Sequence, residues 1–184
     1  MQALYTRFLN VNISIYNVTE GQVRIGNISI SDNTHPGTTS SQYPTINSSA
    51  VDIVAWPPAQ FNGPGGAFVA LPPGRNGRFM GIPTNASNTT LLHEFGHFLF
   101  DLSWAPAPIL VDEYGTAPAD SACIQELTFT PLRWCFSDNH QAQASQPTSC
   151  WQQILADYPR FTYANTNVSA LPPADPVVTY TDTP

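Results

Sequence analysis

The amino-acid sequence predicts an α+β fold: a small twisted mixed sheet with a backing helix and a second, buried helix, above an irregular lower subdomain that carries a short C-terminal helix. Apolar residues recur at helical and strand-like spacings through the first 100 residues. Beyond residue 101 the chain becomes proline-rich and irregular, and its 18 prolines and 11 glycines argue against a large regular sheet. We therefore expect an upper subdomain at 1–100, a lower one at 101–170, and a linker or tail to further domains at 171–184.

The first two elements follow from the spacing of apolar residues. Leu4, Phe8 and Leu9 lie at helical spacing and predict a helix over about 2–16, although the end of this stretch also alternates like a strand. Apolar and polar residues alternate over 23–30, which predicts a half-buried strand.

Three further strands are predicted before residue 83. "AVDIVAWP", at 50–57, is a short apolar run typical of a central strand. "AFVAL" at 67–71 and "RFMGI" at 78–82 are two more strand candidates, separated by the turn sequence "PPGRNG".

Two more helices are predicted from their capping residues. Asn88 or Thr89 is a good N-cap for a helix over about 89–101, which is apolar on almost every face and is therefore expected to be buried. Ser149 is a good N-cap for a short helix that Pro159 ends.

Charge and hydropathy exclude two classes of partner. The net charge is −7 and the chain contains no lysine, so it lacks the basic surface that binds nucleic acid or anionic membranes. No apolar run approaches the ~20 residues that span a bilayer. Both partners are therefore set aside, and the expectation of a protein or peptide substrate comes from the metal motif described below.

Cysteines and glycosylation sequons favour a secreted, extracellular protein. Cys135 and Cys150 lie in a loop-rich region at a spacing that suits one disulfide, worth ~3 kcal/mol. The alternative is that both, together with Cys123, are buried free thiols of a cytosolic protein. Seven Asn-X-Ser/Thr sequons also fit an exported chain: Asn12, Asn17, Asn27, Asn47, Asn85, Asn88 and Asn167.

The sequence "HEFGH" predicts a catalytic zinc site. His93 and His97 are one helical turn apart, so both rings face the same way and reach one ion. Glu94 lies about 100° around the helix from His93, where it suits a general base better than a ligand. This composition gives roughly 0.002 chance matches to the motif. The alternative, two core histidines with ordinary hydrogen bonds, explains neither the spacing nor the glutamate.

A third ligand has to come from another part of the chain. Asp101 continues the helical series but rises ~12 Å from His93, so we expect a helix-end carboxylate. "VDEYG" offers Asp112 and Glu113, which spacing alone does not separate. His140 is a further candidate.

The chain resembles the metalloprotease domain of the calcium-activated chloride channel regulator (CLCA) family and its microbial relatives, which are metzincin-like zincins. The resemblance rests on "HEFGH" followed by "DEYG", on "LYTRFLNVNISIYNVTEGQVRIGNISISDN", and on "CIQELTFTPLRWCFSDNH" with "SCWQQI". It covers most of residues 3–155. It implies zinc as cofactor, His93, His97 and Asp112 as ligands, and Glu94 as general base. It also implies a disulfide between Cys135 and Cys150, and self-cleavage.

The sequence departs from this family at two places. Asp101 stands where the family has glycine, and about eight residues, "SWAPAPIL", are inserted before the acidic pair. Longer loops cost only ~0.6 kcal/mol per doubling, so the ligand can still return to the helix. Gln125 replaces the methionine that metzincins place beneath the metal.

The resulting hypothesis is a zinc-dependent endopeptidase in which Glu94 takes a proton from a zinc-activated water. Tyr114, Arg133 and His140 are candidates to stabilise the oxyanion. One alternative is a gluzincin-type peptidase with Glu113 as third ligand. Another is a non-enzymatic secreted adhesion or scaffold module with a zincin fold, against which the glutamate argues because a structural zinc needs no base.

Overall fold

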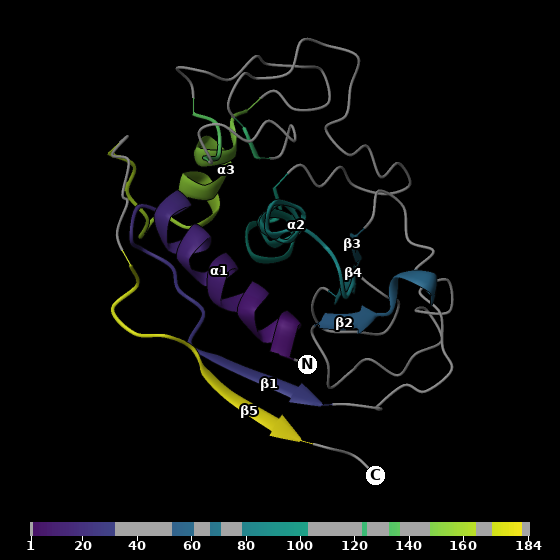
Figure 1. Cartoon of the computed structure of the whole chain (residues 1–184). Coiled ribbons are helices and arrows are strands. Elements are labelled where there is room, and N and C mark those ends of the chain that lie inside the picture. The colour runs from purple at the N-terminus through teal and green to yellow at the C-terminus, as the bar shows by residue number, and fades with distance from the viewer. Residues whose placement is uncertain are drawn as a thin grey trace.

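The structure, a computed structural model, combines helices and strands, as Figure 1 shows. It describes residues 2–31, 53–60, 67–70, 79–102, 123–124, 133–136, 148–164 and 171–181. The elements in chain order are α1 (Gln2–Val18), β1 (Asn27–Ser31), β2 (Ile53–Trp56), η3 (Pro58–Gln60), β3 (Phe68–Ala70), β4 (Phe79–Pro83), α2 (Asn88–Phe100), α3 (Cys150–Asp157) and β5 (Val177–Thr181). The predicted α+β class is confirmed.

Helix α1 confirms the first predicted helix and extends it to Val18. Phe8, Val11 and Ile15 are buried at spacings of three and four residues, so the apolar stripe fits a helix through the whole stretch. The helix ends where Thr19 uses its hydroxyl to bind Ile15 O, at 2.7 Å, and where Glu20 takes a positive φ of 53°.

Strand β1 begins later than the sequence predicts, at Asn27 instead of Val23. The Ile25 N–H donates to the Asn12 side-chain oxygen, at 2.6 Å, so the chain before β1 is held by α1 and not by a strand partner.

The partner of β1 is β5, which lies in the stretch that the sequence predicts to be a linker or tail. The two strands run parallel, with Asn27 opposite Val177 and Ser31 opposite Thr181. The linker prediction therefore fails over Val177–Thr181, because short alternating residues such as "VVTYT" become a strand when a distant partner is available.

A three-stranded mixed sheet has the order β2-β4-β3, with β2 parallel and β3 antiparallel to β4. The strand predictions at 67–71 and 78–82 are confirmed. The apolar run at 50–57 also forms a strand, but β2 lies at the edge of the described sheet and not at its centre. Its side chains alternate between half-buried and buried, as expected when one face of a strand is covered.

Gly81 on β4 faces the Phe68 ring on β3. A Cβ built at Gly81 would lie less than 3.0 Å from three ring atoms of Phe68, whereas one at Gly26 meets nothing within 4 Å. We expect Gly81→Ala to lower the free energy of unfolding by about 1–3 kcal/mol because the ring has to move out of its packed position. Gly26→Ala is the matched control and is expected to stay within about 0.5 kcal/mol of wild type. Urea denaturation of both variants measures the difference; equal stability would contradict this packing.

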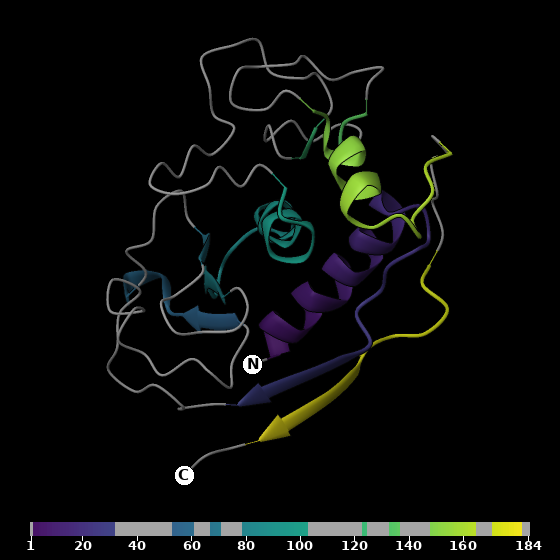
Figure 2. The same ribbon diagram turned by 180° about the vertical axis from the view of Figure 1, so that it is seen from behind.

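The described elements form layers, with α1 between the β1–β5 pair and α2, and α2 between α1 and the three-stranded sheet (Figures 1 and 2). Phe8 on α1 contacts Phe95 on α2 edge to face, at a centroid distance of 6.4 Å. Buried Met80 and Ile82 supply the sheet side of the same core. Helix α2 is therefore covered on both sides.

Helix α3 confirms the second capping prediction. Ser149 accepts a hydrogen bond from Gln152 N–H, and the Gln152 side chain accepts from Ser149 N–H, which completes a capping box. The helix ends at Asp157, two residues before Pro159. No helix among the described residues is long and apolar enough to cross a membrane.

The structure is incompatible with glycosylation at Asn12, one of the seven predicted sites. The Asn12 side chain is only 1% exposed, and its oxygen accepts the Ile25 N–H. A glycan cannot be accommodated there in the folded chain. Asn27, Asn85 and Asn88 are exposed, whereas Asn47 and Asn167 lie outside the described residues.

Candidate metal centre

Helix α2 positions the predicted catalytic motif in the core. Its N-cap is Ser87, not Asn88 or Thr89: the Ser87 hydroxyl accepts the Thr90 N–H at 3.0 Å. Every residue from Leu91 to His97 is buried. The apolar character of this segment thus predicted its burial correctly, and the polar side chains of the motif are buried with it.

The two motif histidines lie against each other, and we call His93 and His97 the histidine pair. Their Nε2 atoms are 3.1 Å apart, and their ring planes meet at 83°. The side chains are 1% and 8% exposed, respectively. The predicted convergence of both rings on one point is present.

Each ring of the histidine pair is oriented by a backbone carbonyl. His93 Nδ1 lies 3.2 Å from Ile124 O, and His97 Nδ1 lies 2.5 Å from Leu102 O. Because a carbonyl oxygen only accepts hydrogen bonds, Nδ1 of each ring is the donor, and the two Nε2 atoms are left facing each other. This is the arrangement that zinc-binding histidines have in proteins, where the second ring nitrogen donates to a carbonyl or carboxylate.

A left-handed backbone conformation at Asp101 places the Leu102 carbonyl next to the His97 ring. Asp101 is the C-cap of α2, with φ 59° and ψ 23°, and the Leu102 N–H turns back to Gly96 O at 3.3 Å. The Leu102 carbonyl then faces the His97 ring. The prediction that Asp101 is a helix-end residue is confirmed. Glycine is favoured in this backbone conformation, and this is the position where the resembled family has glycine.

Residues distant in sequence also form hydrogen bonds to the C-terminal end of α2 and to the Ile124 segment. The Gln153 side chain, on α3, donates to Asp101 O at 2.7 Å, and the Tyr158 hydroxyl donates to Leu99 O at 3.1 Å. The Ile124 N–H donates to Arg133 O at 2.9 Å, which holds the carbonyl that faces His93. Sequence patterns do not predict these contacts, because each acceptor is a backbone carbonyl and two of the donors are side chains about 50 to 60 residues away in the chain.

Glu94 is the third polar residue of the motif and is 6% exposed. Burying a carboxylate in an apolar helix costs several kcal/mol unless other groups compensate for it. A glutamate at this position is retained only together with groups that compensate for its burial.

Several predicted site residues lie outside the described residues: Asp112, Glu113, Tyr114 and His140, together with Gln125 at the position of the family's methionine. Of the three candidates for oxyanion stabilisation, Arg133 is described and is half-buried, next to the Ile124 segment. Whether Asp112 or Glu113 is the third ligand stays a prediction.

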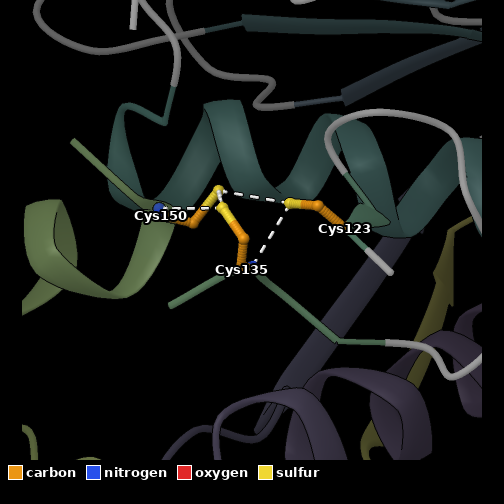
Figure 3. Close-up of side chains that lie close together, drawn as sticks. All are labelled: Cys123, Cys135 and Cys150. Atoms are coloured by element: carbon orange, nitrogen blue, oxygen red, sulfur yellow. Dashed lines mark hydrogen bonds between the residues drawn. The ribbon is translucent and has the colours of Figure 1, made fainter. Parts of the chain in front are cut away.

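Three cysteines come together in a second cluster of potential metal ligands, the thiol cluster (Cys123, Cys135 and Cys150) shown in Figure 3. All three are buried free thiols. Sγ of Cys150 lies 3.4 Å from Sγ of Cys135 and 3.6 Å from Sγ of Cys123. Within the part of the chain that the structure describes, only here do three such ligand atoms lie within 4.8 Å of one another. The three cysteines are thus buried free thiols, the alternative to the Cys135–Cys150 disulfide; their convergence was not predicted, because their spacing matches no known motif.

Two of the three thiols are not activated as nucleophiles. The hydrogen bond with the Cys135 side chain, together with burial, raises the pKa of Cys123 to about 12, and burial raises the pKa of Cys150 well above its ordinary value. Because the thiolate is the reactive form, Cys123 and Cys150 are inert as catalysts at neutral pH. Cys135 and Cys150 are adjacent, as the predicted disulfide requires, but they are not bonded.

Comparisons of the chain with protein-family models, with curated proteins and with solved structures gave no match. The resemblance to the CLCA family therefore rests on the motif residues themselves.

Proposed function

We propose that the protein is a zinc-dependent endopeptidase with a metzincin-like zincin fold. One observation carries this proposal: two buried histidines present their Nε2 atoms to each other at 3.1 Å while backbone carbonyls hold both Nδ1 atoms. Glu94, buried next to His93 in the sequence, supplies the base that a purely structural zinc site does not need.

The donor set fits zinc. Two neutral rings whose Nε2 lone pairs face each other repel, and a cation that both nitrogens share removes this repulsion. A separation of 3.1 Å is compatible with two nitrogens that each lie about 2.0–2.1 Å from one zinc ion. Without a metal, the close contact requires one ring to donate a hydrogen bond from Nε2 to the other.

The proposed site contains metal ligands and a general base. His93, His97 and Asp112 would hold the ion, with Asp112 assigned from the resemblance. When bound, zinc supplies Lewis acidity, which makes water a nucleophile at neutral pH and polarises a carbonyl group. Glu94 accepts the proton of the attacking water and passes it to the leaving amine.

The sheet supplies a surface for the substrate. Strand β4 lies between β2 and β3 and so has both edges paired. Among the described strands, β3 pairs with β4 alone. Its other edge is our candidate for backbone hydrogen bonds to an extended peptide. In the chain, β3 is followed by β4 and then by α2.

Peptide cleavage tests this function. Purified protein reloaded with zinc is incubated with a mixed peptide library, and the products are identified by mass spectrometry. We expect internal cleavage that stops on addition of a chelator and resumes when zinc is restored. An intact-mass time course in the same samples detects self-cleavage. A zinc-loaded sample that cuts nothing would instead favour the non-enzymatic adhesion or scaffold module.

A further inference from the structure

We propose that the thiol cluster is a second metal site, in which Cys123, Cys135 and Cys150 bind one thiophilic divalent cation such as zinc and thereby fix the segment that orients His93. This site is separate from the histidine pair and does not depend on the proposed peptidase activity.

The convergence of all three sulfurs points to a cation and not to a disulfide. A disulfide joins two of the sulfurs and leaves the third buried against it, whereas a metal uses all three. Zinc–sulfur bonds of about 2.3 Å put the sulfurs of one tetrahedral site about 3.8 Å apart. Two of the separations here are 3.4 and 3.6 Å and all three lie within 4.8 Å, so small shifts suffice to admit the ion.

Backbone groups already favour thiolate ligands at the cluster. The Cys135 N–H donates to Cys123 Sγ at 3.2 Å, and the Cys150 N–H donates to Cys135 Sγ at 3.3 Å (Figure 3). Such hydrogen bonds stabilise the negative charge that sulfur keeps when it binds a metal. Binding displaces the thiol protons to solvent, so no oxidant or reductant is required.

The three ligands lie on separate segments that have little regular structure. Cys123 precedes Ile124, Cys135 lies within 133–136, and Cys150 is the first residue of α3. The described contacts between these segments include two backbone hydrogen bonds, Ile124 N–H to Arg133 O and Trp151 N–H to Cys135 O. A cation would close the loops between the segments and so reduce the entropy of the unfolded chain.

A cation bound at the thiol cluster would also constrain the position of the histidine pair. Ile124 directly follows Cys123, and its carbonyl is the acceptor for His93 Nδ1 at 3.2 Å. Fixing Cys123 therefore fixes the group that sets the tautomer and direction of His93. The thiol cluster is in this sense a positioning device for the histidine pair.

Cobalt(II) is the probe for this site, because thiolate ligands give it an intense near-ultraviolet charge-transfer absorption that nitrogen and oxygen ligands do not give. The chain is purified anaerobically without reductant, stripped of metal and titrated with cobalt(II) and, separately, with zinc. We expect the thiolate band in wild type and in the His93→Ala/His97→Ala double variant, and its loss in Cys123→Ser. Zinc analysis should show one ion fewer per chain in Cys123→Ser than in wild type.

Ile154→Val, which trims a buried residue of α3 without removing a sulfur, is the control and should keep the band. If Cys123→Ser does not fold, the presence or absence of the thiolate band in wild type and in the His93→Ala/His97→Ala variant decides whether the thiol cluster binds the metal. Absence of the thiolate band at saturating cobalt(II) would overturn the proposal. So would a count of one free thiol in the denatured chain as isolated, which would show that two of the three cysteines form a disulfide instead. A band that survives in the double variant while peptidase activity is never found would refute the proposed function and leave this site standing.

Discussion

Replacing Glu94 with glutamine is expected to slow peptide cleavage by about 10²–10⁴-fold while zinc remains bound. Glutamine keeps the size and shape of the side chain but cannot accept the proton of the attacking water. The buried position of Glu94, which is 6% exposed, also means that solvent does not easily replace it as a base. The two rings proposed to bind zinc are oriented by the carbonyls of Ile124 and Leu102, which the substitution leaves in place.

The measurement is kcat/KM on a peptide identified from the library, together with the zinc content of the same samples. Glu20→Gln is the matched control: Glu20 accepts a backbone hydrogen bond from Ala164 at the end of α1, outside the motif, and its loss should leave cleavage unchanged. If Glu94→Gln cleaved as fast as wild type, Glu94 would not be the general base.

The motif and its helix were predictable from sequence because their geometry is local. The spacing of His93 and His97 puts both rings on one face of any α-helix, and the apolar residues around them require burial. The position of the helix was correct to within a residue, although the cap is Ser87. Capping choices among adjacent Ser, Asn and Thr residues differ by a fraction of a kcal/mol, too little for sequence to decide.

The remaining features depend on contacts between residues far apart in the chain. Strand β5 forms because Val177 meets Asn27, about 150 residues earlier in the chain, and a short polar-apolar alternation in a proline-rich tail gives no sign of that partner. The thiol cluster likewise needs three irregular segments to meet, with no motif spacing between their cysteines. The carbonyls of Ile124 and Leu102 are invisible to sequence patterns, since every residue has one. Periodicity predicted the helices and most strands; it did not predict what orients the site.

The left-handed backbone conformation of Asp101 is linked to the orientation of His97 in the proposed metal site. In the sequence this aspartate stands where the resembled family has glycine and therefore weakens the resemblance. In the structure its backbone has the φ of 59° that glycine adopts easily, and the turn it makes delivers the Leu102 carbonyl to His97. The geometry required at this position is thus retained although the residue type differs, which supports the assignment of the second histidine as a ligand.

Removing any one of the three proposed zinc ligands is expected to abolish stoichiometric zinc binding at this site. His93→Ala and His97→Ala each leave a single ring nitrogen from α2, and Asp112→Ala removes the carboxylate assigned from the resemblance. Glu113→Ala should keep its zinc, because the neighbouring residue is not a ligand. His35→Ala, in a polar turn sequence, is the control for a histidine outside the site. Zinc retained in Asp112→Ala but lost in Glu113→Ala would transfer the ligand to Glu113 and make the enzyme gluzincin-like.

The same variants should also lose the stability that zinc provides. A ligand that binds only the folded state adds RT ln(1 + [L]/Kd), about 2.7 kcal/mol when free zinc is 100 times its Kd. A chelator should therefore lower the free energy of unfolding of wild type by more than it lowers that of His97→Ala. The difference between the two chelator effects isolates the histidine site, because any zinc at the thiol cluster contributes equally to both proteins. Equal chelator effects would mean that the histidine pair holds no metal, and that its close Nε2 contact is an ordinary hydrogen bond between one protonated and one neutral ring.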